Sequence, residues 1–260
     1  AKSDFTKMNS EVQKIVEDYD FGSVIFFANN IKETEQSYNL TMDLQKAATK
    51  DNGIPLLISA DQEGGSVYRL GSGTALPGNM ALGATGDVNN AKIAGEIIGS
   101  ELSSLGINTN LAPVVDVNNN PSNPVIGLRS YGDDAEMVGK MASAEIEGLA
   151  EYNVIGCAKH FPGHGDVATD SHYGLPIVNK SKEELLNNEL KPYKVSINQG
   201  IEMIMSAHIL YPQLDNTTVY SEKTKQQEKL PSTLSHKIIT DLLKNELGFK
   251  GVVVTDAMNM

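Results

Sequence analysis

The sequence predicts an α/β fold, namely a (β/α)8 barrel of the TIM type that is incomplete at both ends. Short apolar runs alternate with amphipathic stretches of helical periodicity along the 260 residues, and this alternation is typical of parallel strands joined by helical crossovers. The apolar runs are nearly continuous, as in strands that helices cover. A polar or ionisable residue follows almost every run, and in such a barrel the carboxyl ends of the strands meet on one face.

A doubly wound open sheet has the same alternation, but it would spread the strand ends along a crevice. Turn formation explains two of the polar residues at strand ends, Asn29 and Asp116. Turn formation explains Lys159, His160 and His208 poorly. The number of polar groups at strand ends favours the convergent face of a barrel. The polar groups that follow the predicted strands are Asn29, Asp61, Asp116, Lys159 with His160, His208 and Asp256.

We expect six strands, each a short apolar run of the sequence. They are predicted at residues 22–29, 56–60, 107–116, 154–158, 201–208 and 251–256. An eight-stranded barrel needs one further strand before Val24 and another after Asp256. We therefore expect residues 1–260 to form a single barrel domain that lacks its first and last strands.

The helices are predicted from apolar residues spaced three and four apart. Gly106 ends one of them in the usual C-terminal manner, and Ser181 with Glu184 forms a capping box for another. Pro192 is expected to begin a fresh turn, and the polar segment 220–229 to form an exposed excursion. The predicted helices cover residues 8–19, 34–50, 88–105, 134–150 and 234–248, with one more beginning after Ser181.

Composition excludes several classes of partner. The net charge of −12 argues against nucleic acid and anionic membranes as main partners. No apolar run approaches the roughly 18–20 residues that span a bilayer, and the sequence shows no basic region followed by the apolar region of a signal peptide. Cys157 is the single cysteine, so no disulfide framework exists. We expect a monomer that binds a small molecule.

The stretch from Lys159 to Pro176, KHFPGHGDVATDSHYGLP, holds three of the five histidines. Glycine and proline make it a loop, where catalytic groups often lie. Within it Asp170 stands two residues before His172, a spacing that lets a carboxylate orient an imidazole for proton transfer. Asp256 follows the last predicted strand. An acid and a second carboxylate are the minimal set for glycoside hydrolysis.

Two other chemistries are weighed against this one. The histidines and aspartates of the stretch are all possible metal ligands, but Pro162 and Gly163 prevent the helix that would place His160 beside His164. A thiol mechanism through Cys157 is disfavoured because the residue lies within an apolar strand. No metal and no organic cofactor is expected.

Four motifs in order along the chain give a resemblance to a known family. They are DQEGGSVYRL at 61–70, GLRSYG at 127–132, KHFPGHG followed by DSH and LP at 159–176, and GFKGVVVTDAMNM at 248–260. Together they resemble glycoside hydrolase family 3, in particular its β-N-acetylglucosaminidase, or NagZ-type, branch. Ser66 departs from the pattern, since the family commonly has arginine there. The ending TDAMNM is similar to Gram-positive members with a second, C-terminal α/β domain, which is absent here.

The resemblance implies a role for each matching residue. Asp256 matches the nucleophile of a retaining mechanism, His172 matches the general acid/base, and Asp170 matches the partner of that histidine. The positions that match contacts to a terminal N-acetylglucosamine are Asp61, Arg69, Arg129, Lys159, His160 and His208. The family uses no metal or organic cofactor.

The resemblance thus implies an exo-acting β-N-acetylhexosaminidase that removes N-acetylglucosamine from peptidoglycan fragments or chito-oligosaccharides. A family 3 β-glucosidase or β-xylosidase is an alternative, and so is a non-catalytic sugar-binding fragment. Transfer of the sugar to phosphate instead of water also stays open. A bacterial protein is expected, outside the cytoplasm if it follows the Gram-positive members and cytoplasmic otherwise.

Overall fold

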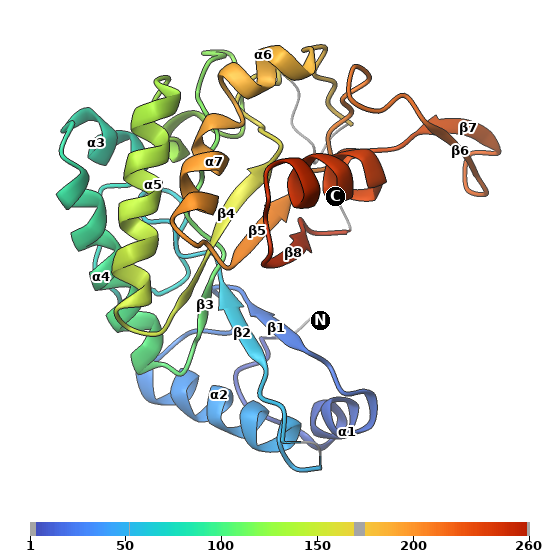
Figure 1. Cartoon of the computed structure of the whole chain (residues 1–260). Coiled ribbons are helices and arrows are strands. Elements are labelled where there is room, and N and C mark those ends of the chain that lie inside the picture. The colour runs from blue at the N-terminus through green and yellow to red at the C-terminus, as the bar shows by residue number, and fades with distance from the viewer. Residues whose placement is uncertain (1–3, 52, 169–174, 259–260) are drawn as a thin grey trace.

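Six parallel strands form the main sheet of the protein, which a computed structural model describes over residues 4–51, 53–168 and 175–258. Every neighbouring pair is parallel, and the order across the sheet follows the order along the chain. The sheet curls into part of a barrel (Figure 1), which confirms the predicted incomplete barrel. The strands are β1 (Ser23–Phe26), β2 (Leu57–Ala60), β3 (Thr109–Asn110), β4 (Ile155–Phe161), β5 (Met203–Ser206) and β8 (Val252–Thr255).

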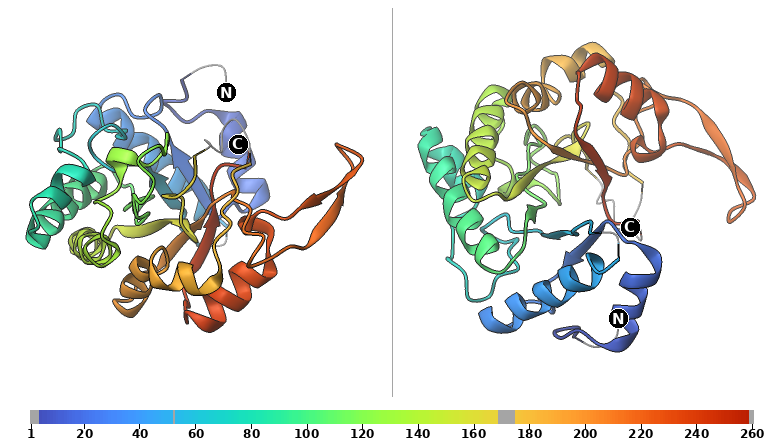
Figure 2. Two further views of the ribbon diagram at one scale, coloured as in Figure 1. Left: turned by 90° about the horizontal axis from the view of Figure 1, so that it is seen from above. Right: turned by 60° about the horizontal axis from the view of Figure 1, so that its bottom comes forward.

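Helices cover the outer face of this curled sheet, as the two views of Figure 2 show. The predicted capping box is confirmed, because the Ser181 side chain accepts from the Glu184 amide and the Glu184 carboxylate accepts from the Ser181 amide. The helices are α1 (Ser10–Tyr19), α2 (Thr34–Ala48), α3 (Asn79–Ala84), α4 (Val88–Ser104), α5 (Ala135–Ala150), α6 (Lys182–Asn187), α7 (Lys191–Asn198) and the π-helical η3 (Lys237–Glu246), with short 3-10 turns η1 (Gly127–Arg129) and η2 (Ser232–Leu234). None of the helices in the described ranges is both long and apolar enough to cross a membrane.

The third strand departs most from its predicted length. Sequence reasoning placed it over residues 107–116, but the ladder covers only Thr109–Asn110. Pro113 has no amide hydrogen and therefore interrupts the regular pairing. Single hydrogen bonds continue past it, such as Val115 N to Lys159 O at 2.8 Å, so the chain still runs alongside β4 as far as the site.

Two other segments also differ from the sequence-based expectation. The short helix α3 lies in a region for which no helix was predicted. The polar excursion is an antiparallel hairpin, β6 (Thr218–Ser221) with β7 (Gln226–Lys229), which projects from the body of the protein (Figure 1).

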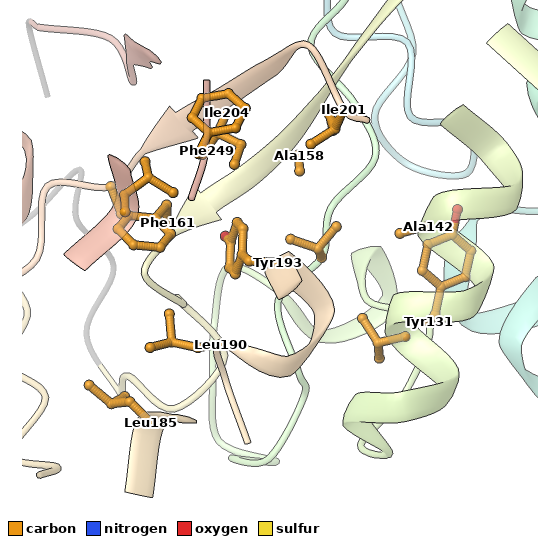
Figure 3. Close-up of a cluster of buried hydrophobic side chains, with 14 of the residues drawn as sticks. Tyr131, Ala142, Ala158, Phe161, Leu185, Leu190, Tyr193, Ile201, Ile204 and Phe249 are labelled. Carbon is orange, nitrogen blue, oxygen red and sulfur yellow. The ribbon is translucent and has the colours of Figure 1, made fainter. Parts of the chain in front are cut away.

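The largest apolar cluster lies between the sheet and helices α5, α7 and η3. Phe161 at the end of β4 packs edge-to-face on Tyr193 of α7, with ring centroids 5.1 Å apart (Figure 3). A separate, smaller cluster is formed by Leu111, just after β3, with Cys157 of β4 and with Met203 and Met205 of β5. The predicted packing role of the cysteine is confirmed, since it is fully buried and burial raises its pKa to about 12.

A buried carboxyl in α5 supports the loop that follows β3. Helix α4 contacts α5 backbone to backbone, since a Cβ atom at Gly95 would lie 2.2 Å from the carbonyl oxygen of Glu145. The Glu145 side chain is completely enclosed and accepts a hydrogen bond from the Tyr131 hydroxyl. Burial raises the pKa of Glu145 to about 7, although this hydrogen bond opposes the shift.

We expect Glu145 to make the protein less stable as pH rises from about 4.5 to about 7. Below its ordinary value of 4.5 the carboxyl is protonated in both the folded and the unfolded state. Between pH 4.5 and 7 the unfolded chain releases this proton while the folded chain keeps it. The unfolding free energy therefore falls over this range, by about 3 kcal/mol.

The substitution Glu145→Gln keeps the shape of the side chain and removes its ionisation. Urea unfolding at pH 5 and pH 8 should show a flatter pH dependence for this variant and a gain in stability over wild type at pH 8. Glu147→Gln, at an exposed position of the same helix, should keep the wild-type slope. A Glu145→Gln variant with that slope would contradict the assignment.

Candidate active site

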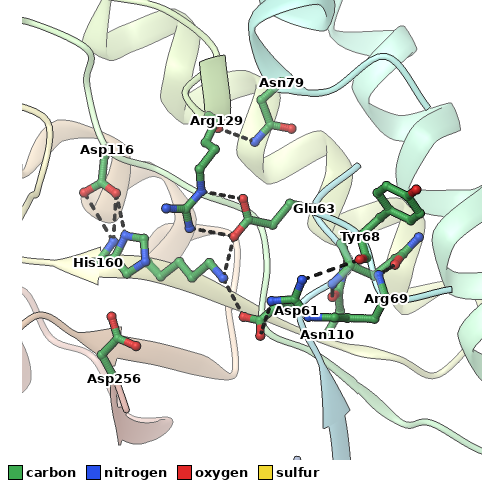
Figure 4. A network of polar contacts seen from close by, with 12 residues as sticks. Asp61, Glu63, Tyr68, Arg69, Asn79, Asn110, Asp116, Arg129, His160 and Asp256 are labelled. Carbon is green, nitrogen blue, oxygen red and sulfur yellow. Dashed lines mark hydrogen bonds and ion pairs between the residues drawn. The ribbon is translucent and has the colours of Figure 1, made fainter. Parts of the chain in front are cut away.

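Polar residues at the carboxyl ends of β2, β4 and β8 are gathered at one edge of the sheet (Figure 4). The carboxyl ends of parallel strands share this edge, so residues distant in sequence meet there. The register of β4 against β5 shifts between Lys159 and Phe161, and such an irregularity re-aims side chains. The two basic residues at 159 and 160 both join the network at this edge.

The ammonium group of Lys159 forms the centre of the network. Its side chain is 2% exposed, with Nζ 2.9 Å from Asp61 Oδ1 and 2.7 Å from Glu63 Oε1. Burial alone would lower the pKa of Lys159, but the two carboxylates outweigh burial and raise it. Asp61 also pairs with Arg69, whose Nη2 lies 3.4 Å from Oδ2. The lysine is thus a permanent buried cation.

Arg129 grips Glu63 with two parallel hydrogen bonds, from Nε to Oε2 and from Nη2 to Oε1, both 2.8 Å long. The carbonyl of Arg129 accepts from Asn79 Nδ2 of α3 at 2.8 Å, which fixes the arginine turn η1. Burial would raise the pKa of Glu63, but Lys159 and Arg129 together hold it well below the ordinary value. Glu63 is therefore an anion between two cations.

Sequence reasoning missed Glu63, although it lies two residues after Asp61 in the same motif. Turn formation was one explanation for Asp116 at its strand end, but this aspartate is an acceptor for three groups. His160 Nδ1 lies 2.7 Å from Asp116 Oδ2, and the amides of His160 and His164 donate to its carboxylate at 3.2 and 2.6 Å. The position of Asp116 at a strand end was the available signal for both its burial and its role.

A close backbone contact keeps the loop after β4 against Asp116. A Cβ atom at Gly165 would lie 1.7 Å from the carbonyl oxygen of Val117, so only glycine fits at this position. Asp116 is itself held from the other side, because Ser130 Oγ donates to its carbonyl at 2.6 Å. The imidazole of His160 is consequently fixed in orientation by contacts from two loops.

Asp256 follows β8, which pairs with β5. Its amide donates to Ser206 O at 3.0 Å, and its Oδ1 accepts from the Ala257 amide at 2.8 Å. Burial would raise the pKa of Asp256, but His160 and then the Ala257 amide and Lys159 lower it. Asp256 is therefore a partly buried carboxylate in the field of the cations described above.

His208 lies two residues beyond β5 and contacts protein groups through both ring nitrogens. Nδ1 is 3.0 Å from Thr233 Oγ1, and Nε2 is 3.2 Å from the carbonyl oxygen of Ala257. The structure thus brings together Asp61, Arg69, Arg129, Lys159, His160 and Asp256, with His208 beside the last of them. Asp170 and His172 lie outside the described residues.

The arrangement has the chemistry of a site for a polyhydroxylated ligand, with the carboxylate of Asp256 beside it. Carboxylates, guanidinium groups, an ammonium and an imidazole can together accept from and donate to several hydroxyls. A metal site is not apparent, since no group of three or more possible ligands comes together in the part of the chain that the structure describes.

Curated relatives match almost the entire chain. Residues 2–260 match the model of the glycosyl hydrolase family 3 N-terminal domain. Beta-hexosaminidase A of Pseudoalteromonas piscicida is 43% identical over 98% of the chain, which covers 44% of that protein. The beta-hexosaminidase of Neisseria meningitidis serogroup B is 34% identical over 98% of the chain, and here 68% of the relative is covered.

Solved structures give the same result. A family 3 β-N-acetylglucosaminidase from Paenibacillus sp. FPU-7 superposes with a TM-score of 0.91 at 45% identity, over 98% of this chain and 47% of the other. NagZ from Neisseria gonorrhoeae, in complex with N-trifluoroacetyl-D-glucosamine, gives a TM-score of 0.86 at 32% identity, over 97% and 72%. The chain therefore spans less than half the length of some of these proteins. It belongs to glycosyl hydrolase family 3, whose N-terminal domain it matches.

Proposed function

We propose that the protein is a retaining exo-β-N-acetylhexosaminidase that releases terminal N-acetylglucosamine, with residues 1–260 forming its barrel domain. The observation that carries the proposal is the fixed cluster of Asp61, Lys159, Arg129 and His160 beside the carboxylate of Asp256. A family 3 β-N-acetylglucosaminidase and a beta-hexosaminidase are 45% and 43% identical to the chain, which supports the same reaction here.

The cluster keeps hydrogen-bonding capacity for a sugar. Lys159 has three N–H groups, of which two face Asp61 and Glu63. Arg129 has five, of which two bind Glu63 and one points to Val125 O at 3.3 Å. His160 uses Nδ1 for Asp116 and keeps Nε2. Each oxygen of Asp61 retains a lone pair. These groups suit hydroxyls of a terminal pyranose.

The chemical step begins at Asp256. Its carboxylate attacks the anomeric carbon, so that a bond from C1 to the aspartate oxygen forms as the bond from C1 to the departing oxygen breaks. The surrounding cations keep Asp256 ionised, and partial burial limits its hydration by water. A covalent glycosyl-enzyme results, in which the aspartate is an ester.

The proton transfers are assigned to His172 on the strength of its motif. In the first step His172 donates a proton to the departing oxygen, with Asp170 as the hydrogen-bond partner of the ring. In the second step the neutral imidazole takes a proton from water, which attacks C1 and releases the Asp256 carboxylate. N-Acetylglucosamine leaves with retained configuration.

The natural substrate that we propose is a fragment of peptidoglycan or a chito-oligosaccharide, both of which present this sugar at their non-reducing ends. A panel of chromogenic β-glycosides tests the sugar specificity of the full-length protein. Turnover of the N-acetylglucosaminide well above that of the glucoside and the xyloside is expected. Preference for either of the latter would replace the proposal by a β-glucosidase or β-xylosidase.

Asp256→Ala should abolish hydrolysis, with a loss of at least about 10³-fold in kcat, because no covalent intermediate can form.

His172→Ala should lower kcat by roughly 10²–10⁴-fold on substrates with poor leaving groups. The loss should be smaller for the first step with a nitrophenyl leaving group, which departs without protonation. Steady-state kinetics on both substrate types measures these losses, and unchanged turnover in Asp256→Ala would overturn the proposal.

Glu63→Gln should weaken both the site and the fold, because it leaves Lys159 and Arg129 as buried cations with one anion fewer. Breaking a buried pair on one side costs about 3–5 kcal/mol, measurable by urea unfolding at neutral pH. We also expect kcat/KM to fall by roughly 10²-fold, as expected for misplaced substrate contacts. The control Glu136→Gln removes an exposed ion pair with Lys140 and should cost about 1 kcal/mol or less.

A further inference from the structure

The imidazole of His208 connects two parts of the chain that flank the nucleophile. On one side it meets Thr233, in the turn η2 that follows the β6–β7 hairpin. On the other it meets the carbonyl of Ala257, the residue directly after Asp256. The amide of the same alanine donates to Asp256 Oδ1 at 2.8 Å. The ring therefore binds the residue whose amide orients the Asp256 carboxylate.

The protons of the ring follow from its partners. A carbonyl oxygen only accepts, so Nε2 must carry the hydrogen that points to Ala257. Nδ1 faces the Thr233 hydroxyl, which can donate to it or accept from it while donating instead to Ala207 O, 2.8 Å away. In either arrangement both nitrogens are used within the protein, and neither remains for a sugar hydroxyl.

Two hydrogen bonds hold the backbone on either side of Asp256. Its amide bonds to Ser206 O upstream, and the His208 ring holds Ala257 downstream. Thr233 is held in turn by Ser206 Oγ at 3.2 Å. With Oδ1 bound to the Ala257 amide, Oδ2 is the oxygen left to attack.

We propose that His208 is a positioning residue for Asp256 and makes no contact with the sugar. The inference rests on the proposed function, since it assigns Asp256 as the nucleophile. It differs from the role that the motif resemblance implied for His208. Loss of the ring frees the peptide after Asp256, and misplacing a reacting atom by about 1 Å can cost roughly 10²-fold in rate.

The test compares His208→Leu with His208→Gln in the full-length protein. Leucine removes both contacts, whereas the glutamine amide can still donate to the Ala257 carbonyl. We expect His208→Leu to lower kcat on the chromogenic N-acetylglucosaminide by roughly 10–100-fold, and His208→Gln to recover most of that loss. The competitive inhibition constant of N-acetylglucosamine should stay within about twofold of wild type in both, because the sugar contacts remain.

Thr233→Val provides a second line of evidence through the same contact. It should lower kcat partly, and in the double variant with His208→Leu it should cause no further loss. His236→Leu, at an exposed histidine of the same chain, is the control and should behave as wild type. Circular dichroism at the assay temperature checks that each variant is folded. If His208→Leu is unfolded, the comparison is made with His208→Gln and Thr233→Val.

The possible outcomes distinguish the positioning role of His208 from the proposed function. A weaker inhibition constant in the His208 variants at near-normal kcat would show a sugar contact and overturn the positioning role. The positioning role would also be overturned if Thr233→Val had full activity and His208→Gln did not recover kcat. An inactive wild-type protein on every glycoside of the panel would overturn the proposed function itself, and the role of His208 with it.

Discussion

The buried ammonium group of Lys159 is the interaction on which the site depends. Removing a charge from water costs several kcal/mol, and only well-placed partners can offset that cost. Asp61 and Glu63 supply those partners from the segment after β2, and Arg129 neutralises the second of them from the turn after β3. Each group in the chain of charges would be unfavourable alone. The three segments must therefore meet in one arrangement for any of them to be buried.

This mutual requirement links the helices on the outside of the sheet to the chemistry on its edge. The turn that carries Arg129 is fixed by Asn79 of α3 through its carbonyl, and by the hydrogen bond from Tyr131 to Glu145 inside α5. The same loop reaches Asp116 through Ser130. A change in packing between α4 and α5 would thus reach the arginine and, through Glu63, the lysine.

Much of the fold could be predicted from the sequence because hydrophobic periodicity is a local signal. The residues that cap or end helices and strands are local signals too. Six strands, the capping box at Ser181 and the site-bearing strand ends were all found in this way. The length of the third strand could not be predicted, because the effect of Pro113 depends on whether the strand ladder requires an amide hydrogen at that position. Within the site, the residues that act on other residues were missed. Glu63 and Asp116 contact partners 66 and 44 residues away, and no local pattern contains such a distance.

In the proposed mechanism, the charges around Asp256 have to satisfy two opposing requirements. A nucleophile must be ionised, which the cations favour, yet strong hydrogen bonding to its oxygens would make it a poor one. The structure separates these demands in space. His160 and Lys159 act on Asp256 through their field, while the one hydrogen bond among the described residues goes to Oδ1 from a backbone amide. That amide belongs to Ala257, which His208 holds. The backbone after β8 therefore decides which oxygen of Asp256 accepts the hydrogen bond and which is left to attack. In the proposed mechanism, the geometry of attack is then set by His208, which holds the residue after Asp256.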